Sequence, residues 1–141
     1  MKRPTLPRRI PRAPEVGETA VFTRTLTDGD VSLFIGATWD VNPFHTDDNF
    51  VKETRFGRRI VPGLLTASLL THLGGLWNFL GTKMTFEFLG PVYVGDTVTA
   101  VAEVGEVHEN GRVRLLCRVT NTDGVEVLKA DILGFPGTFE E

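Results

Sequence analysis

The sequence predicts an α+β fold in which an antiparallel sheet wraps around one long, buried central helix. The helix is expected over residues 62–80, the longest apolar segment, whose apolar residues lie on all sides rather than on one stripe. That distribution is typical of a helix in the middle of a fold. The sheet is expected in the C-terminal half, where Asn110-Gly111 and Asp123-Gly124 each predict a two-residue turn between antiparallel strands.

Length and charge narrow the class of protein. A chain of 141 residues is long enough for one domain with a core of its own. The formal net charge of −3 gives the whole molecule no electrostatic reason to bind nucleic acid. We expect no membrane span, because no apolar run reaches about 18 residues. The single cysteine, Cys117, fits a reducing compartment, and no apolar secretory signal precedes the domain, so we expect a cytoplasmic protein.

Residues 1–16 differ from the rest of the chain and are predicted to form an N-terminal arm, followed by a single domain over residues 17–141. The first fourteen residues carry basic side chains without an acid, and prolines interrupt any helix. The arm could bind a partner or an acidic carrier. A solvated, extended tail along the domain surface is the simpler interpretation.

The first predicted elements are a strand and a short helix. Residues 19–26 alternate and are rich in β-branched side chains, which favours a strand. Thr27 is placed as the N-cap of the helix, with Asp28 and Asp30 where the helix dipole favours acids. The apolar stripe of that helix consists of Val31, Phe34 and Ile35.

The central helix and the remaining strands follow from capping and alternation. Pro62 stands where a helix start tolerates proline, and Gly81 stands where a C-cap is expected. Residues 84–89 and 97–107 are strand-like, and the last strand loses its alternation at Val127-Leu128, which predicts a bulge. Between the two glycine turns, one predicted face is apolar and the other basic: Val113, Leu115, Cys117 and Val119 against Arg112, Arg114 and Arg118.

The segment T-W-D-V-N-P-F-H places Asp40 and His45 five residues apart. On a helix, five steps of about 100° leave two side chains roughly 140° apart, and on a strand they point to opposite faces. The two can therefore converge only if the chain turns between them. Asn42-Pro43 supplies such a turn, because proline fixes its own φ and pushes the preceding residue into an extended conformation. A carboxylate and an imidazole held together on an irregular loop make a good acid–base pair.

Three blocks carry a resemblance to a known family: F-I-G-A-T-W-D-V-N-P-F-H-T-D, F-G-R-R-I-V-P-G-L-L and F-L-G-P-V-Y-V-G-D-T-V. Their order and spacing over residues 34–99 resemble the MaoC-like, or hydratase-2, family. That family includes (R)-specific enoyl-CoA hydratases and 3-hydroxyacyl-thioester dehydratases. The resemblance implies a hot-dog fold, a homodimer whose sheets join, and an acyl-thioester substrate near the interface, either acyl-CoA or an acyl carrier protein thioester.

The resemblance also implies site residues. Asp40 and His45 match the catalytic aspartate and histidine, which act on one shared water, and Gly63 matches the glycine whose amide serves as an oxyanion-hole donor. The free N–H groups at a helix start suit that role. No cofactor is expected, since coenzyme A or phosphopantetheine is part of the substrate.

Further residues are candidates for substrate binding. Arg58 and Arg59, in a basic group with Lys52 and Arg55, could contact substrate phosphates, although a solvated turn is the default interpretation. Thr71 and Gly74, with Gly75 and Trp77 nearby, would line an acyl tunnel if the helix faces the substrate, and ordinary helix packing explains them equally well. Asn42 is included in the site, but we expect it to shape the loop through its own backbone.

Two positions depart from the family pattern. Trp39 stands where the family usually has glycine, and Val51 where it usually has a small residue. We expect Trp39 to matter more, because a large ring beside the acid could reshape the pocket or narrow the substrate range.

Other polar residues favour structural interpretations. Asp47-Asp48 beside His45 could suggest a metal site, but helix capping or solvation is favoured and no metal is expected. His72, within the apolar helix, is expected to be a hydrogen-bonded core or pocket residue. His108, before a hairpin tip, is expected to be exposed.

The predicted activity is hydration of enoyl thioesters, with two alternatives left open. Hot-dog proteins also include acyl thioesterases, which generally place a carboxylate on the central helix, and residues 64–80 contain no Asp or Glu. The other alternative is a non-catalytic subunit that binds acyl thioesters with a site impaired by Trp39.

Overall fold

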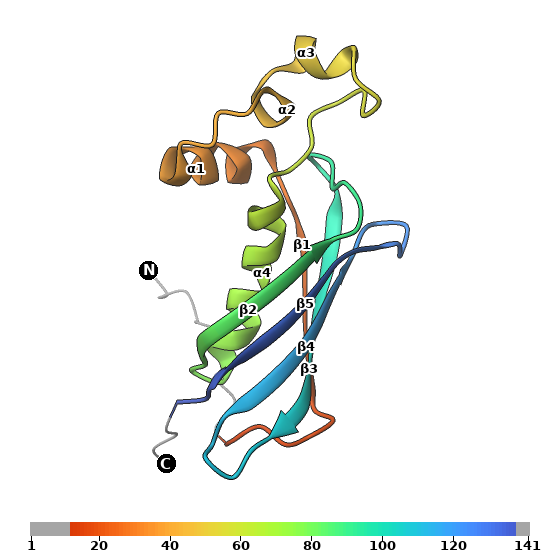
Figure 1. Cartoon of the computed structure of the whole chain (residues 1–141). Coiled ribbons are helices and arrows are strands. Elements are labelled where there is room, and N and C mark those ends of the chain that lie inside the picture. The colour runs from red at the N-terminus through yellow and green to blue at the C-terminus, as the bar shows by residue number, and fades with distance from the viewer. Residues whose placement is uncertain (1–11, 138–141) are drawn as a thin grey trace, which may run out of the picture.

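The computed structural model describes residues 12–137 as one antiparallel sheet with a long helix against one face (Figure 1). The described elements, in chain order, are β1 (Thr19–Thr25), α1 (Asp28–Thr38), α2 (Pro43–Thr46), α3 (Asp48–Lys52), α4 (Gly63–Leu76), β2 (Leu80–Phe88), β3 (Thr97–Val107), β4 (Val113–Thr120) and β5 (Glu126–Phe135). The strand order is β1-β3-β4-β5-β2, so β1 and β2 form the two edges. The α+β prediction is confirmed.

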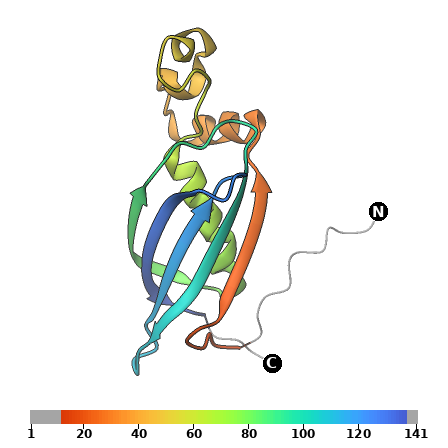
Figure 2. The same ribbon diagram turned by 90° about the vertical axis from the view of Figure 1, so that its right-hand side faces the viewer.

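The sheet curves around α4, and the three short helices lie together at one end of it (Figures 1 and 2). That end is where α4 begins, at Gly63. The start of the central helix and the segment carrying Asp40 and His45 are therefore placed at the same end of the molecule.

Alternation along the central strands builds the core. The four apolar residues predicted to face inward on β4 are buried, while Arg114 and Arg118 lie on the other face. On β3 the buried residues are Val98, Ala100, Ala102 and Val104. They form one cluster with the inner face of α4, including Leu69, Leu70 and Leu73.

The end of α4 corrects the sequence prediction. The helix stops at Leu76, and Asn78 adopts a left-handed φ of 49°. Phe79 N–H donates to Gly74 O at 2.9 Å and Asn78 N–H donates to Gly75 O at 3.3 Å, which together form a Schellman motif. Asn tolerates this conformation, so it replaces the predicted cap. Gly81 lies instead within β2, which begins four residues earlier than expected.

The prediction that α4 is buried on all sides is wrong for one face. Leu64 is 58% exposed, and Thr71 and Gly75 are also exposed on the same side of the helix. The sheet covers only one side of α4 in a single chain. An apolar face is therefore left uncovered beside edge strand β2.

The two hairpins occur where predicted, but their turns are one residue longer. His108 N–H donates to Arg112 O at 2.8 Å and Gly111 N–H donates to His108 O at 2.9 Å, with Gly111 at φ 85°. The second hairpin repeats this pattern around Gly124. In both, only the glycine has positive φ, whereas a two-residue turn would need the preceding residue there too.

The predicted bulge on the last strand is confirmed. Val119 pairs with Leu128 and Thr120 pairs with Glu126, so Val127 has no partner in the ladder. Val127 and Leu128 are consequently both buried, which accounts for the lost alternation.

The predicted N-terminal arm falls mostly outside the described residues, which begin at Arg12. Its boundary with the domain stays a prediction. Arg12 itself forms an ion pair with Glu18, just before β1. In the described part of the chain, none of the helices combines the length and the hydropathy that crossing a bilayer needs.

Candidate active site

The segment that carries the predicted acid and base runs from the end of α1 through a turn into α2. α1 starts with a capping box, in which Asp30 N–H donates to Thr27 Oγ1 and Thr27 N–H donates to Asp30. It ends at Trp39, whose φ of 59° turns the chain. Asn42 then caps α2, accepting the Phe44 N–H on its side-chain oxygen at 3.1 Å. His45 therefore lies on a short helix, not on an irregular loop.

Asp40 and His45 face each other. Asp40 Oδ2 lies 3.8 Å from His45 Nε2, which is too long for a direct hydrogen bond and leaves both atoms available to one water molecule. The other carboxylate oxygen, Oδ1, accepts the Asn42 N–H at 3.3 Å. His45 is buried, whereas the Asp40 side chain is 42% exposed. The turn predicted from the spacing brings the two side chains together.

The backbone selects the tautomer of the neutral His45 ring. His45 Nδ1 lies 2.8 Å from Ile60 O. A carbonyl oxygen can only accept, so Nδ1 carries the hydrogen and donates it. In the neutral ring, Nε2 then has a free lone pair directed toward Asp40, as a general base requires.

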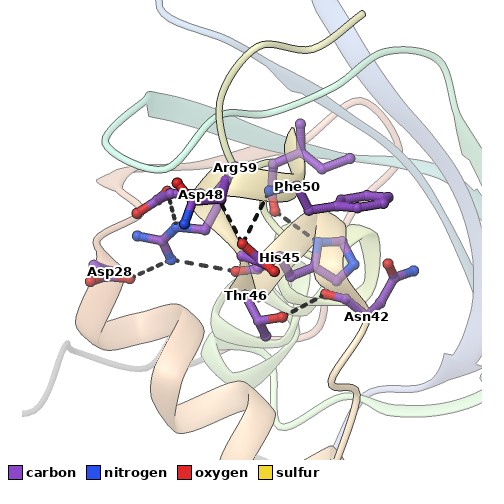
Figure 3. A network of polar contacts seen from close by, with 10 residues as sticks. Asp28, Asn42, His45, Thr46, Asp48, Phe50 and Arg59 are labelled. Atoms are coloured by element: carbon purple, nitrogen blue, oxygen red, sulfur yellow. Dashed lines mark hydrogen bonds and ion pairs between the residues drawn. The ribbon is translucent and has the colours of Figure 1, made fainter. Parts of the chain in front are cut away.

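Arg59 binds the three short helices together (Figure 3). Its Nη1 donates to Asp28 Oδ1 at 2.8 Å and its Nε donates to Asp48 Oδ1 at 2.8 Å. Nη1 also donates to the backbone oxygen of His45 at 3.4 Å. Hydrogen bonding and attraction to Arg59 lower the pKa of the Asp28 carboxyl. The guanidinium is thus occupied by protein acceptors, and contact between Arg59 and a substrate phosphate stays a prediction.

Gly63 lines two cavities. A cavity of about 630 Å³ contains His45 and Gly63, and a cavity of about 430 Å³ contains Asp40 and Gly63. The Phe88 ring borders both, and a Cβ built on Gly63 would lie 2.8 Å from Phe88 Cε1. Gly63 is the first residue of α4, so its N–H has no acceptor within the helix and can serve a ligand.

The larger cavity extends toward the basic group. Arg55 and Tyr93 line it, and the Arg58 guanidinium lies over the Tyr93 ring, 4.1 Å from the centroid. Arg58 also lies 4.0 Å from Asp96, and 62% of its side chain is exposed. Arg58 therefore lies against a residue that lines the cavity and keeps donors exposed to solvent, unlike Arg59.

A third cavity, of about 270 Å³, lies between α4 and β2. Thr71 and Gly74 line it together with Met84 and Phe86. Gly75 also lines it, but Trp77, which the sequence placed nearby, is completely buried in the core and does not. The cavity is mostly apolar, as an acyl chain would require.

The remaining polar candidates have structural partners. Asp47 caps α3 by accepting the Asn49 and Phe50 N–H groups, which confirms its capping role, and Asp48 bonds Arg59. His72 stacks on Phe22 with ring centroids 4.0 Å apart rather than forming a hydrogen bond in the described residues. His108 is exposed, as predicted, and lies 3.1 Å from Glu106.

The two departures from the family pattern do not enter the cavities. Trp39 is 84% exposed and lines none of the three described above. Its left-handed φ is the conformation that favours glycine. Val51 is the completely buried residue of α3.

Two residues at the site were missed from the sequence. Phe88 covers Gly63, and Thr66 lines the cavity that contains His45. Thr66 lies three residues after Gly63, a spacing that places both residues on one face of a helix, so this signal was available. The position of Phe88 depends on how β2 crosses the start of α4.

Comparisons with known proteins agree with this geometry. The MaoC like domain family matches residues 12–127. The 3-hydroxybutyryl-CoA dehydratase of Methylorubrum extorquens is 35% identical over 79% of this chain and 74% of its own length. The (R)-specific enoyl-CoA hydratase of Aeromonas caviae is 35% identical over 78% of this chain and 85% of its own length. The solved structure of an (R)-hydratase from A. caviae involved in PHA biosynthesis superposes with a TM-score of 0.85, at 30% identity, over 89% of this chain and 99% of that one.

Proposed function

The chain belongs to the MaoC-like domain family, and from this premise we propose that it is a hydro-lyase. It catalyses the reversible hydration of trans-2-enoyl thioesters to (R)-3-hydroxyacyl thioesters, the chemistry for which its relatives are named. The observation that carries the proposal is the facing pair: Asp40 Oδ2 and His45 Nε2 lie 3.8 Å apart beside the first residue of α4.

The pair supplies the proton transfers. His45 Nε2 takes a proton from a water molecule as the water oxygen bonds to Cβ, and Asp40 Oδ2 holds the second hydrogen of that water in place. The double-bond electrons move to Cα and the thioester oxygen, and the pair then returns a proton to Cα. One water is added in total, and dehydration follows the same path in reverse.

The start of α4 stabilises the charge that develops. Negative charge grows on the thioester oxygen as Cβ is attacked, and the Gly63 N–H lies at the positive end of the α4 dipole. Glycine lets the carbonyl approach closely. The Phe88 ring packs against Gly63 on the side where a Cβ would lie, and we infer that it moves aside when substrate binds.

The cavities suggest how the substrate lies. The acyl chain occupies the cavity lined by Thr71 and Gly74, while the coenzyme A or phosphopantetheine arm leaves past Arg55 and Arg58. Asn42 contributes by capping α2. No group beyond the substrate's own coenzyme A or phosphopantetheine is required, since each step uses only protons and the fixed amide.

We place the working protein in the cytoplasm as a homodimer. Strand β2 is a sheet edge with an unpaired side, and apolar residues are exposed along it and on the uncovered face of α4. These exposed residues are Leu64, Leu80, Met84 and Phe88. A second copy that pairs with β2 would extend the sheet and cover this apolar surface.

An assay with crotonyl-CoA tests the activity. The purified protein should remove the enoyl absorbance without releasing free thiol. Thiol release would instead show a thioesterase, which the absence of an acidic side chain on α4 argues against. If neither absorbance loss nor thiol release occurs with short and long enoyl thioesters, the proposal is wrong and a non-catalytic binding subunit is the better description.

A further inference from the structure

Thr66 carries a buried hydroxyl group that has no partner. The residue is 3% exposed, and its Oγ1 makes no hydrogen bond within the described part of the chain. A buried hydroxyl without a partner is costly, and such groups in a protein call for an explanation. The Thr66 backbone is satisfied, because its N–H donates to Pro62 O at 3.3 Å. Only the side-chain hydroxyl lacks a hydrogen-bond partner in the described part of the chain.

Three other helical hydroxyl groups have a hydrogen-bond partner within the protein. Thr38 Oγ1 donates to Phe34 O at 2.8 Å, Ser68 Oγ donates to Leu65 O at 2.6 Å and Thr71 Oγ1 donates to Ser68 O at 2.6 Å. Each bonds back to a carbonyl of its own helix, which is the usual solution for Ser and Thr. Thr66 lies on the same helix as Ser68 and Thr71 but does not use this solution.

The unpartnered hydroxyl belongs to a residue that lines the catalytic cavity. Thr66, Gly63, His45 and Phe88 all line the cavity of about 630 Å³. Thr66 lies one helical turn after Gly63, so the two residues are on the same face of α4. A donor from Thr66 and the amide of Gly63 can therefore reach one ligand atom in that cavity.

The ring of Phe88 covers the start of α4 beside Gly63. It lies against Gly63, at 2.8 Å from a Cβ built there, while 54% of the residue is exposed. A half-exposed ring can rotate toward solvent without disrupting the core. The first turn of α4 would then be open to a ligand.

We propose that the Thr66 hydroxyl donates a hydrogen bond to the thioester carbonyl oxygen, as a second donor beside the Gly63 N–H, once the Phe88 ring moves aside. This inference rests on the proposed function and adds a residue to it. The hydroxyl then gains in the complex the partner that it lacks in the free protein.

Kinetics of two variants test the proposal. Thr66→Val keeps the shape and removes the hydroxyl, and it should lower kcat for crotonyl-CoA by about 10²- to 10³-fold with a smaller change in KM. Thr66→Ser keeps the hydroxyl and should retain most of kcat. Since Val removes an unsatisfied polar group, the melting temperature of Thr66→Val should be unchanged or higher. A near-normal kcat for Thr66→Val, or a loss of activity matched by a loss of stability, would overturn the proposal.

A binding comparison separates this proposal from the assigned activity. Butyryl-CoA has the thioester carbonyl but cannot be hydrated, and S-butyl-CoA lacks the carbonyl. Calorimetry should show that the wild-type protein binds butyryl-CoA more tightly, and that Thr66→Val reduces this preference severalfold while Thr66→Ser keeps it. An equal preference in the wild type and Thr66→Val would rule out contact between hydroxyl and carbonyl. If the wild-type protein prefers butyryl-CoA to S-butyl-CoA in this way but does not hydrate crotonyl-CoA, the proposed activity is wrong. The contact between the Thr66 hydroxyl and the thioester carbonyl would still stand.

Discussion

The Ile60 carbonyl holds the ring of His45, with Nδ1 and O 2.8 Å apart. Ile60 is itself held in place by two backbone interactions. Its N–H donates to Phe44 O at 3.1 Å, and it forms a β-bridge with Tyr93. The proposed base, His45, is therefore oriented by the backbone, whereas its proposed partner Asp40 is partly exposed. We therefore expect replacement of the two residues to have different effects on the stability of the protein.

Replacing either member of the pair should abolish most activity. Asp40→Asn and His45→Asn remove acid–base function, so we expect kcat for crotonyl-CoA to fall by about 10²- to 10⁴-fold. Asp40→Asn should leave the melting temperature nearly unchanged, because the side chain is 42% exposed. His45→Asn should lower it, because a buried ring that bonds Ile60 is lost. Either variant keeping a near-normal rate would refute the assignment.

Arg59 and Arg58 should give different kinetic defects. Arg59→Met removes the bonds to Asp28, Asp48 and the His45 carbonyl, so we expect stability to fall by about 1 kcal/mol and kcat to fall as His45 loses its position. Arg58→Met, at a side chain 62% exposed, should leave stability unchanged and raise KM through lost phosphate contact. Urea unfolding and steady-state kinetics measure both. A raised KM with normal kcat and stability in Arg59→Met would show that Arg59 contacts substrate instead.

Acid should destabilise the protein through its paired carboxylates. Hydrogen bonding to Arg114 lowers the pKa of Asp131, and hydrogen bonding to Arg59 lowers that of Asp28. A folded-state pKa below the unfolded value, about 3.9 for Asp, stabilises the fold above that value. This stabilisation is lost as the pH falls from there through the folded-state pKa. The urea midpoint of the wild type should therefore fall more steeply below about pH 4 than that of Asp131→Asn.

A matched control for the acid effect is Asp123→Asn. Asp123 lies in the turn between β4 and β5 and has no ion-pair partner in the described part of the chain. Its midpoint should follow the wild-type curve. If plots of the urea midpoint against pH are parallel for Asp131→Asn and the wild type, the ion pair between Asp131 and Arg114 does not contribute to the loss of stability in acid.

Local features of the sequence were sufficient for much of the fold. The Thr27 N-cap, the Asp47 cap and the alternation of β4 each depend on residues close in sequence, and all were predicted, whereas the Asp30 half of the capping box was not. The Asn42-Pro43 turn likewise brought Asp40 to His45. Confirmation of the catalytic roles themselves awaits the variants above.

Features that depend on tertiary contacts could not be read from the sequence. α4 ends at Leu76 because burial of Trp77 and the left-handed Asn78 outweigh the continuing apolar pattern. Arg59 was a candidate for phosphate contact or for a solvated turn, but its partner Asp28 is far away in sequence and is brought near by folding. The same holds for Phe88, which meets Gly63 only because β2 passes the start of α4.

Trp39→Gly should stabilise the protein. Trp39 has a φ of 59°, which costs a non-glycine residue about 1 kcal/mol, and its ring is 84% exposed, so little burial is lost. We expect a gain of roughly 0.5–1 kcal/mol in the free energy of unfolding, measured by urea denaturation at fixed protein concentration. Trp39→Ala removes the ring but keeps the strain, and should show no gain. Because the ring lines none of the three cavities, relative rates on short and long enoyl-CoA substrates should stay the same in both variants. Broader chain-length acceptance in both would instead show that the Trp39 ring restricts the substrate, as it could if the ring lies at the subunit interface of the homodimer that we propose.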